Sequence, residues 1–139
     1  MSSPESSSRT PPGRVSWNEL VTPDPAAAAA FYGSLFGWKA GPYQASVPVE
    51  GLPPYTLFQL GPDNVDVAGM LPAPTPGAPG QWFPYFVVAD IRDALQTALG
   101  LGATALAPIK DLGPVGKIVV VRDPQGAVFG LHELVAREG

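Results

Sequence analysis

The chain has no cysteine among its 139 residues. Disulfide bridges, thiolate metal ligands and a cysteine nucleophile are therefore excluded. Charged residues are also scarce: they make up 14% of the sequence, against about 25% in an average domain. Because hydrophobic residues reach 45%, the composition argues against a largely disordered chain. We therefore expect a folded protein without disulfide bridges.

Basic residues are few and do not cluster. Eight Lys and Arg stand against twelve Asp and Glu, so the formal net charge is −4. A negative chain without a Lys/Arg cluster suits neither nucleic acid nor an anionic membrane surface. No apolar run approaches the about 20 residues that span a bilayer, and the first 14 residues contain no apolar segment typical of a secretory signal. We therefore expect a cytoplasmic protein without nucleic-acid or membrane partners.

Length and residue distribution favour one folded domain. At 139 residues the chain is close to the commonest domain size. Residues 1–14 are rich in Ser and Pro and show no hydrophobic periodicity, which predicts a disordered N-terminal tail. The remaining residues, 15–139, are expected to form a single domain.

The strongest local pattern predicts a helix that begins after Asp24 and ends at Gly37. An Asp side chain accepts hydrogen bonds from the free N–H groups of a first helical turn, and Pro25 suits the first helical position. Five alanines follow, and alanine is the best helix former. Gly37 can adopt the left-handed conformation that often ends a helix. Large residues spaced four apart predict one apolar stripe, which consists of Phe31, Tyr32, Leu35 and Phe36.

The same pattern recurs 66 residues later, counted from Asp24 to Asp90. Asp90 is the expected N-cap of this second helix, and Gly100 or Gly102 is its expected end. The predicted apolar stripe consists of Ile91, Leu95 and Leu99. The chain therefore contains an internal repeat.

Each predicted helix is preceded by one strand-like run and followed by three. These runs cover residues 15–21, 39–45, 55–60 and 65–71 in the first half, and residues 82–89, 104–109, 117–122 and 127–135 in the second half. The pattern predicts two βαβββ modules, residues 15–71 and 82–135, joined by a Pro-rich linker at 72–81. The predicted fold class is α+β. We expect the modules to form one curved, mostly antiparallel sheet with the helices on its convex face and a concave cup opposite.

Three strings in the sequence resemble one protein family. They are WNELVTPDPAAAAAFYGSLFGWK at residues 17–39, VAGM at 67–70 and VVRDPQGAVFGL at 120–131. With the doubled βαβββ pattern, they resemble the glyoxalase/bleomycin-resistance/dioxygenase group, which is the vicinal oxygen chelate superfamily. The resemblance covers residues 15–135 and implies the curved-sheet fold with a binding site in its cup.

Metal-using members of this superfamily hold the ion with His or Glu side chains inside the cup. The resemblance places Trp17, Gly69, Pro84 and Gly130 at the matching positions. None of these residues has a side chain that binds a divalent cation. The standard metal site is therefore expected to be absent, and no cofactor is predicted. Because the superfamily commonly forms dimers, the resemblance also implies a homodimer.

Strand alternation brings two titratable residues to the predicted cup. If Trp17 faces the cup, Glu19 does so too, and if Gly130 faces it, so does the only histidine, His132. Two ligands are fewer than the three plus water of a working zinc site. Glu19 and His132 are nevertheless the candidates for acid/base chemistry.

Aromatic residues complete the predicted ligand surface. Ligand pockets are mostly apolar with a few polar groups, and indole rings beside a carboxylate suit a cation. The leading hypothesis is a metal-free protein that binds an aromatic or cationic antibiotic-like molecule, as resistance proteins do. The predicted ligand-binding residues are Trp17, Glu19, Phe58, Trp82, Phe86 and His132.

Two alternative functions stay open. The first is an enzyme of the same superfamily, a lyase, isomerase or oxygenase, in which Glu19 and His132 do acid/base work or hold a nonstandard metal. The second is a non-catalytic association module whose cup is filled by its own side chains. The sequence decides neither whether the protein is an enzyme nor which ligand it binds.

Overall fold

The computed structural model describes residues 11–42, 55–75 and 77–135. The chain forms two compact units. The first unit is Trp17–Phe83, and the second unit combines Pro84–Gly139 with the N-terminal residues up to Ser16. These units follow the two predicted modules, with borders that fall inside the first strand of each. A single domain over residues 15–139 and a shared cup stay predictions.

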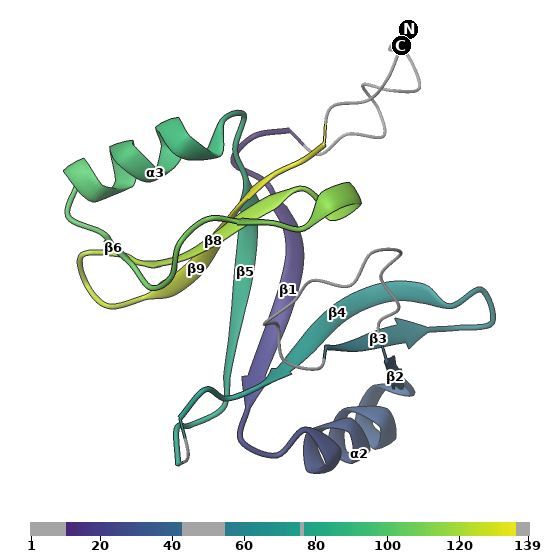
Figure 1. The fold of residues 1–139 in the computed structure, drawn as a ribbon. Helices are drawn as coiled ribbons and strands as arrows, with labels where there is room; N and C mark the ends of the chain where they lie inside the picture. The colour runs from purple at the N-terminus through teal and green to yellow at the C-terminus, as the bar shows by residue number, and fades with distance from the viewer. Residues whose placement is uncertain (1–10, 43–54, 76, 136–139) are drawn as a thin grey trace, which may run out of the picture. The chain divides into compact units, whose positions relative to one another are not determined.

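The first unit contains one helix and a mixed sheet (Figure 1). Its strands lie in the order β2-β3-β4-β1, antiparallel except that β1 pairs with β4 in parallel. Its elements are β1 (Val15–Thr22), α2 (Pro25–Phe36), β2 (Lys39–Pro42), β3 (Thr56–Leu60) and β4 (Val65–Pro72).

The second unit repeats this arrangement (Figure 1). Its strands lie in the order β5-β9-β8-β6, with β7 also on β8, and only β5 and β9 are parallel. The predicted α+β fold class with two βαβββ modules is thus confirmed. The elements are β5 (Gln81–Val87), α3 (Ile91–Gly100), β6 (Thr104–Ala105), β7 (Lys110–Asp111), the 3-10 turn η1 (Gly113–Val115), β8 (Lys117–Arg122) and β9 (Val128–Glu133).

Both helices begin and end as the local sequence predicts. The Asp24 carboxylate accepts a hydrogen bond from the backbone N–H of Ala27 at 3.1 Å, and Gly37 has a φ angle of +77°. The Asp90 carboxylate accepts from the backbone N–H of Asp93 at 3.0 Å. The starts of both helices and the end of α2 therefore follow from local capping chemistry.

The core of the first unit lies between α2 and the sheet. Ala28, Ala29 and Tyr32 of the helix pack against a cluster made of Leu20, Phe58, Ala68 and Met70. The predicted apolar stripe of α2 is only partly correct, because Phe31, Leu35 and Phe36 are more than half exposed. The run of alanines makes this helix apolar on every side, so residue spacing does not determine which side is buried.

The second unit has its own core under α3. Ile91, Val119, Val121 and Leu131 form the buried cluster. Leu95 of the predicted stripe packs against this cluster. This arrangement repeats that of the first unit, so in each module the helix covers the strands of that module.

Three segments differ from the sequence prediction or lie outside the described residues. The strand predicted at 104–109 is reduced to β6, because Pro108 lacks the N–H group of a ladder. Gly13 and Arg14 of the predicted tail exchange two backbone hydrogen bonds with Val87, so the paired chain begins slightly before residue 15. Residues 1–10 of that tail and residues 43–45 of the strand predicted at 39–45 lie outside the described residues. In the described part of the chain, neither helix has the length and apolar character to cross a bilayer.

Candidate functional site

Strand β1 places Trp17 and Glu19 on the face of the first sheet opposite α2. Leu20 is paired with Met70, and both lie in the core under the helix. Because successive side chains of a strand point to opposite faces, Glu19 and its register partner Gly69 face the other way. The predicted placement of Trp17, Glu19 and Gly69 on one face is therefore confirmed.

A hydrogen-bonded chain of three side chains occupies this face. The Tyr55 hydroxyl donates to Oε1 of Glu19 at 3.0 Å, and the Trp17 indole N–H donates to the Tyr55 hydroxyl oxygen at 2.7 Å. Glu19 is only 5% exposed, whereas Trp17 and Tyr55 are half-buried. The two rings are thus held in fixed positions beside a buried acidic group, and part of each ring surface stays accessible.

Gly69 is required for this arrangement. A β-carbon added at Gly69 would overlap the Tyr55 hydroxyl and ring. The phenol therefore occupies the space in which any side chain at position 69 would begin. Sequence analysis missed Tyr55, although it stands at the start of a predicted strand and lies two residues before Leu57, the register partner of Gly69.

Phe58 does not belong to this face, and its predicted placement there is wrong. The side chain is fully buried in the core under α2 with Leu20 and Met70. The pairing of β3 with β4 shifts register between Phe58 and Gln59. The extra residue at this shift, Val67, lies on β4, and the register partner of Phe58 is Ala68, which is buried in the same core.

In the second unit, the residues of β5 that share a face with Gly130 are displaced by one position from the prediction. Tyr85 is the register partner of Gly130, and Phe86 is the partner of Leu131, which lies in the core under α3. The Phe86 ring packs edge-on against Phe129 at 5.9 Å. Phe86 therefore lies on the helix side of the sheet, not on the side of Gly130 and His132 as predicted.

The same register corrects the predicted counterpart of Trp17. Because the helix caps are 66 residues apart, Trp17 corresponds to Phe83 rather than to Pro84. Phe83 is 6% exposed and Tyr85 is 4% exposed. A β-carbon at Gly130 would overlap the Tyr85 ring, which repeats the relation between Tyr55 and Gly69.

His132 is 8% exposed, and both of its ring nitrogens are engaged. Nε2 lies 2.6 Å from the carbonyl oxygen of Val115, and Nδ1 lies 2.8 Å from the Ser16 hydroxyl. Since a carbonyl oxygen only accepts, Nε2 carries the hydrogen, and Nδ1 of the neutral ring accepts from Ser16. The ring thus connects the start of β1 and the turn η1 to β9. A role beside Glu19, which belongs to the first unit, stays a prediction.

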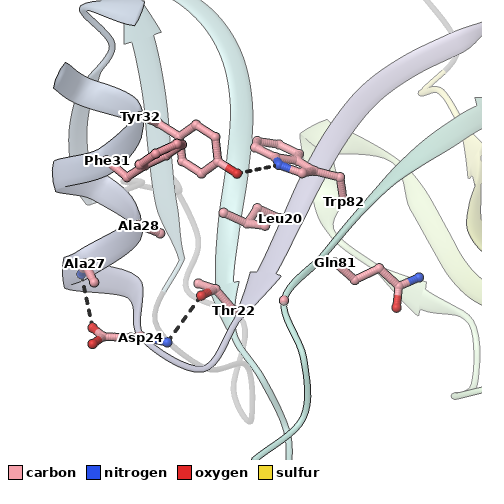
Figure 2. Close-up of a pocket in the computed structure, with 10 residues that line it drawn as sticks. Leu20, Thr22, Asp24, Ala27, Ala28, Phe31, Tyr32, Gln81 and Trp82 are labelled. Carbon is pink, nitrogen blue, oxygen red and sulfur yellow. Dashed lines mark hydrogen bonds between the residues drawn. The ribbon is translucent and has the colours of Figure 1, made fainter. Parts of the chain in front are cut away.

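Trp82 lies on the helix side of the first unit. Its indole N–H donates to the Tyr32 hydroxyl at 2.9 Å, and its ring packs edge-on against Trp38 at 6.1 Å. Trp82 is one of the residues that line an open groove of about 370 Å³ beside α2. Figure 2 shows its side chain next to that of Tyr32. Trp82 therefore does not share the face of Trp17.

The residues present do not fit the metal site implied by the family resemblance. No three His, Cys, Asp or Glu side chains of the described ranges come together as a group that could hold an ion. At Gly69 and Gly130, the direction of a ligand side chain is filled by a tyrosine ring. A His or Glu at either position would require that ring to move.

Comparisons with a family profile and with known proteins indicate the same family for this chain. The family profile described as "Glyoxalase-like domain" matches residues 17–132. CFP32 of Mycobacterium tuberculosis, a protein named as a glyoxylase, is 33% identical over 86% of this chain and 43% of its own length. The anthracycline biosynthesis protein DauV of Streptomyces sp. is 32% identical over 94% of this chain and 50% of its own length. The chain thus spans about half the length of these relatives.

Solved structures show the same fold at low sequence identity. A methylmalonyl-CoA epimerase of Streptomyces coelicolor, in complex with 2-nitronate-propionyl-CoA, superposes with a TM-score of 0.60. It is 15% identical, and the match covers 91% of this chain and all of the epimerase chain. At this identity, the likeness concerns the fold alone.

Proposed function

Because the chain belongs to the glyoxalase-like domain family, we propose that it binds a planar aromatic or cationic small molecule without a metal ion. The ligand surface is the face of the first unit that carries Trp17, Tyr55 and Glu19. The observation that carries this proposal is the hydrogen-bonded chain that joins these three side chains.

Preorganised rings support aromatic binding. Trp17 and Tyr55 are held by hydrogen bonds at 2.7 and 3.0 Å, so little side-chain freedom is lost when a ligand stacks on them. Both rings are half-buried, which leaves part of their surface for contact. Aromatic contacts of this kind contribute about 0.5–1.5 kcal/mol beyond the area that they bury.

Charge favours a ligand with a positive group. The carboxylate of Glu19 lies within hydrogen-bonding distance of the Tyr55 ring system, and the chain has a net charge of −4. A cation is attracted by the faces of Trp and Tyr rings and by a nearby carboxylate. The anthracycline biosynthesis relative supports the same chemical class, because anthracyclines are planar aromatic compounds.

Tryptophan fluorescence tests the proposal. The chain has three tryptophans, of which Trp17 lies on the proposed face and Trp82 lies beside α2. We expect an amino-sugar anthracycline to quench the emission saturably, and Trp17→Phe to weaken binding at least about tenfold, equivalent to about 1.4 kcal/mol. The matched control, Trp82→Phe, should change the dissociation constant less than about twofold.

Two further measurements separate the parts of the proposal. Glu19→Gln should remove the preference for the amino-sugar compound over its uncharged aglycone, because only the former carries a cation. Dialysis against a chelator should leave binding unchanged. Equal losses in Trp17→Phe and Trp82→Phe, or loss of binding after chelation, would contradict the proposal.

An enzyme is the second candidate function, and the glyoxylase name of CFP32 favours it. In that case Glu19 and Tyr55 would exchange a proton with the substrate, since they already share a hydrogen bond. His132 contributes less readily, because each of its nitrogens already has a partner. Turnover that is lost in Glu19→Gln but kept in His132→Gln would favour this function over simple binding.

A further inference from the structure

Ser16 and His132 form a hydrogen-bonded pair in the second unit, away from the residues of the proposed ligand surface. The Ser16 hydroxyl oxygen lies 2.8 Å from Nδ1 of His132. Its distance to the carbonyl oxygen of Tyr85 is 3.5 Å, so the histidine is its principal partner. A serine is activated as a nucleophile when it lies within hydrogen-bond reach of a base that a third group orients.

The third group here is the backbone carbonyl of Val115. Its oxygen lies 2.6 Å from Nε2 of His132, and because a carbonyl oxygen only accepts, the hydrogen of the neutral ring is on Nε2. Nδ1 then presents its lone pair to the Ser16 hydroxyl and can take up the hydroxyl proton. In the serine proteases an aspartate fixes the tautomer of the base in the same way, with the two ring nitrogens in exchanged roles.

The turn that supplies this carbonyl group is itself closed by hydrogen bonds. The Leu112 N–H donates to the Gly116 carbonyl oxygen at 2.8 Å, and the Gly116 N–H donates to the Gly113 carbonyl oxygen at 3.0 Å. Gly116 has a φ angle of +109°, and a β-carbon there would overlap the carbonyl oxygen of Glu133 and lie 3.2 Å from Nε2 of His132. A glycine is therefore needed for backbone to pack this closely on the ring.

The two members of the pair differ in exposure. His132 is 8% exposed. Ser16 is half-buried and follows Val15, which is 45% exposed. A small reagent can therefore reach the serine oxygen, while the base is shielded from water that would compete for its lone pair.

Charged side chains lie near the ring, but both ring nitrogens are bonded to uncharged groups. Glu133 is adjacent to His132 on β9, and Lys117 is its register partner. Because successive side chains of a strand alternate, Glu133 and Lys117 point to the face opposite the ring. The Asp111 carboxylate accepts from the backbone N–H of Gly113 at 3.0 Å. The ring is therefore free of direct pairing with a carboxylate.

We propose that Ser16 is a nucleophile that accepts an acyl group from a small activated ester, with His132 as its general base. The serine oxygen forms a bond to the carbonyl carbon of the ester, and its proton passes to Nδ1 of His132. The bond between that carbon and the alcohol oxygen of the ester then breaks. The alcohol leaves with the proton from Nδ1, and the acyl group stays on Ser16 as a new ester.

Acetylation by p-nitrophenyl acetate tests the proposal, because peptide mapping by mass spectrometry locates the acetyl group. Ser34 is the matched control within the same molecule, since it lies on α2 and is more exposed than Ser16. Exposure alone would favour Ser34, whereas activation by a base favours Ser16. We expect Ser16 to be acetylated at least about 100-fold faster, which is the lower limit of what a positioned base contributes.

His132→Gln tests the base. The glutamine amide can still donate to the Val115 carbonyl group, but it does not take up a proton at neutral pH. Acetylation of Ser16 should slow by about 100-fold, and that of Ser34 should not change. Circular dichroism checks that the variant is folded.

The pH dependence gives a readout on the unmodified protein. The rate at Ser16 should rise with pH in step with the loss of the proton from His132, which nitrogen NMR follows directly because the chain has one histidine. A hydrogen bond with a purely structural role would not couple the two.

Two results would overturn the proposal. The first is acetylation of Ser16 in the unmodified protein that is no faster than acetylation of Ser34, which would show that the serine is not activated. The second is a rate at Ser16 that does not follow the ionisation of His132 or is unchanged in folded His132→Gln, which would show that the histidine is not its base.

Discussion

The hydroxyl group of Tyr55 lies where a side chain at Gly69 would begin. The same hydroxyl group donates to Glu19 and accepts from Trp17. Absence of a β-carbon at one position thus permits the hydrogen bonds of three other residues. The ligand surface proposed above depends on this relationship, which can be tested by stability measurements without any ligand.

Gly69→Ala should lower the free energy of unfolding by about 1–3 kcal/mol, because inserting a methyl group into filled space forces its neighbours apart. Urea denaturation followed by circular dichroism measures the loss. Gly41→Ala is the matched control, since Gly41 also lies in a strand of the first unit and no atom of the described residues lies within 4 Å of its added β-carbon. Similar losses in both variants would show that Tyr55 does not fill the space at Gly69.

Tyr55→Phe removes the hydroxyl group and keeps the ring. We expect a loss of about 1–3 kcal/mol, because the buried Glu19 oxygen and the Trp17 N–H lose their common partner. Tyr32→Phe removes a hydroxyl that accepts from Trp82 at an exposed position, where water can replace it. The control should therefore lose less than about 1 kcal/mol. A larger loss in Tyr32→Phe would contradict the assignment.

Capping of α2 gives a third prediction. Asp24→Ala removes the acceptor of the Ala27 N–H and should cost about 1 kcal/mol of stability. Asp24→Asn keeps a side-chain oxygen at the same place and should retain most of it. Thermal unfolding compares the two variants. Equal losses would mean that the charge of Asp24, rather than its hydrogen bond, stabilises the helix.

Features set by local chemistry could be predicted from the sequence. Asp24 and Gly37 mark the ends of α2 because capping and a positive φ angle depend on adjacent residues only. The doubled βαβββ pattern could also be predicted, because each element is indicated by its own segment of sequence, and it is confirmed. Alternation along β1 also placed Glu19 correctly, since this strand has no bulge within its pairing to β4.

Features that depend on pairing between distant residues could not be predicted from the sequence. Phe58 lies on the opposite side from that predicted because it is paired with Ala68 of the core, and this pairing with β4 cannot be deduced from the sequence of β3. The predicted facing of Phe86 is wrong by one residue, because the register between β5 and β9 cannot be deduced from either strand alone. Tyr55 reaches Glu19 across 36 residues of sequence, and no local pattern indicates that contact.

The single histidine of the chain makes its hydrogen bonding directly observable. Because Nε2 of His132 lies 2.6 Å from the carbonyl oxygen of Val115, nitrogen NMR should show the Nε2–H tautomer of the neutral ring. Ser16→Ala removes the partner of Nδ1 and should cost about 1–3 kcal/mol of stability, yet it should leave the tautomer unchanged, since the carbonyl group still determines it. An Nδ1–H tautomer in the unmodified protein would contradict this assignment, because Nδ1 would then donate to Ser16 and Nε2 would have no hydrogen for the Val115 carbonyl group.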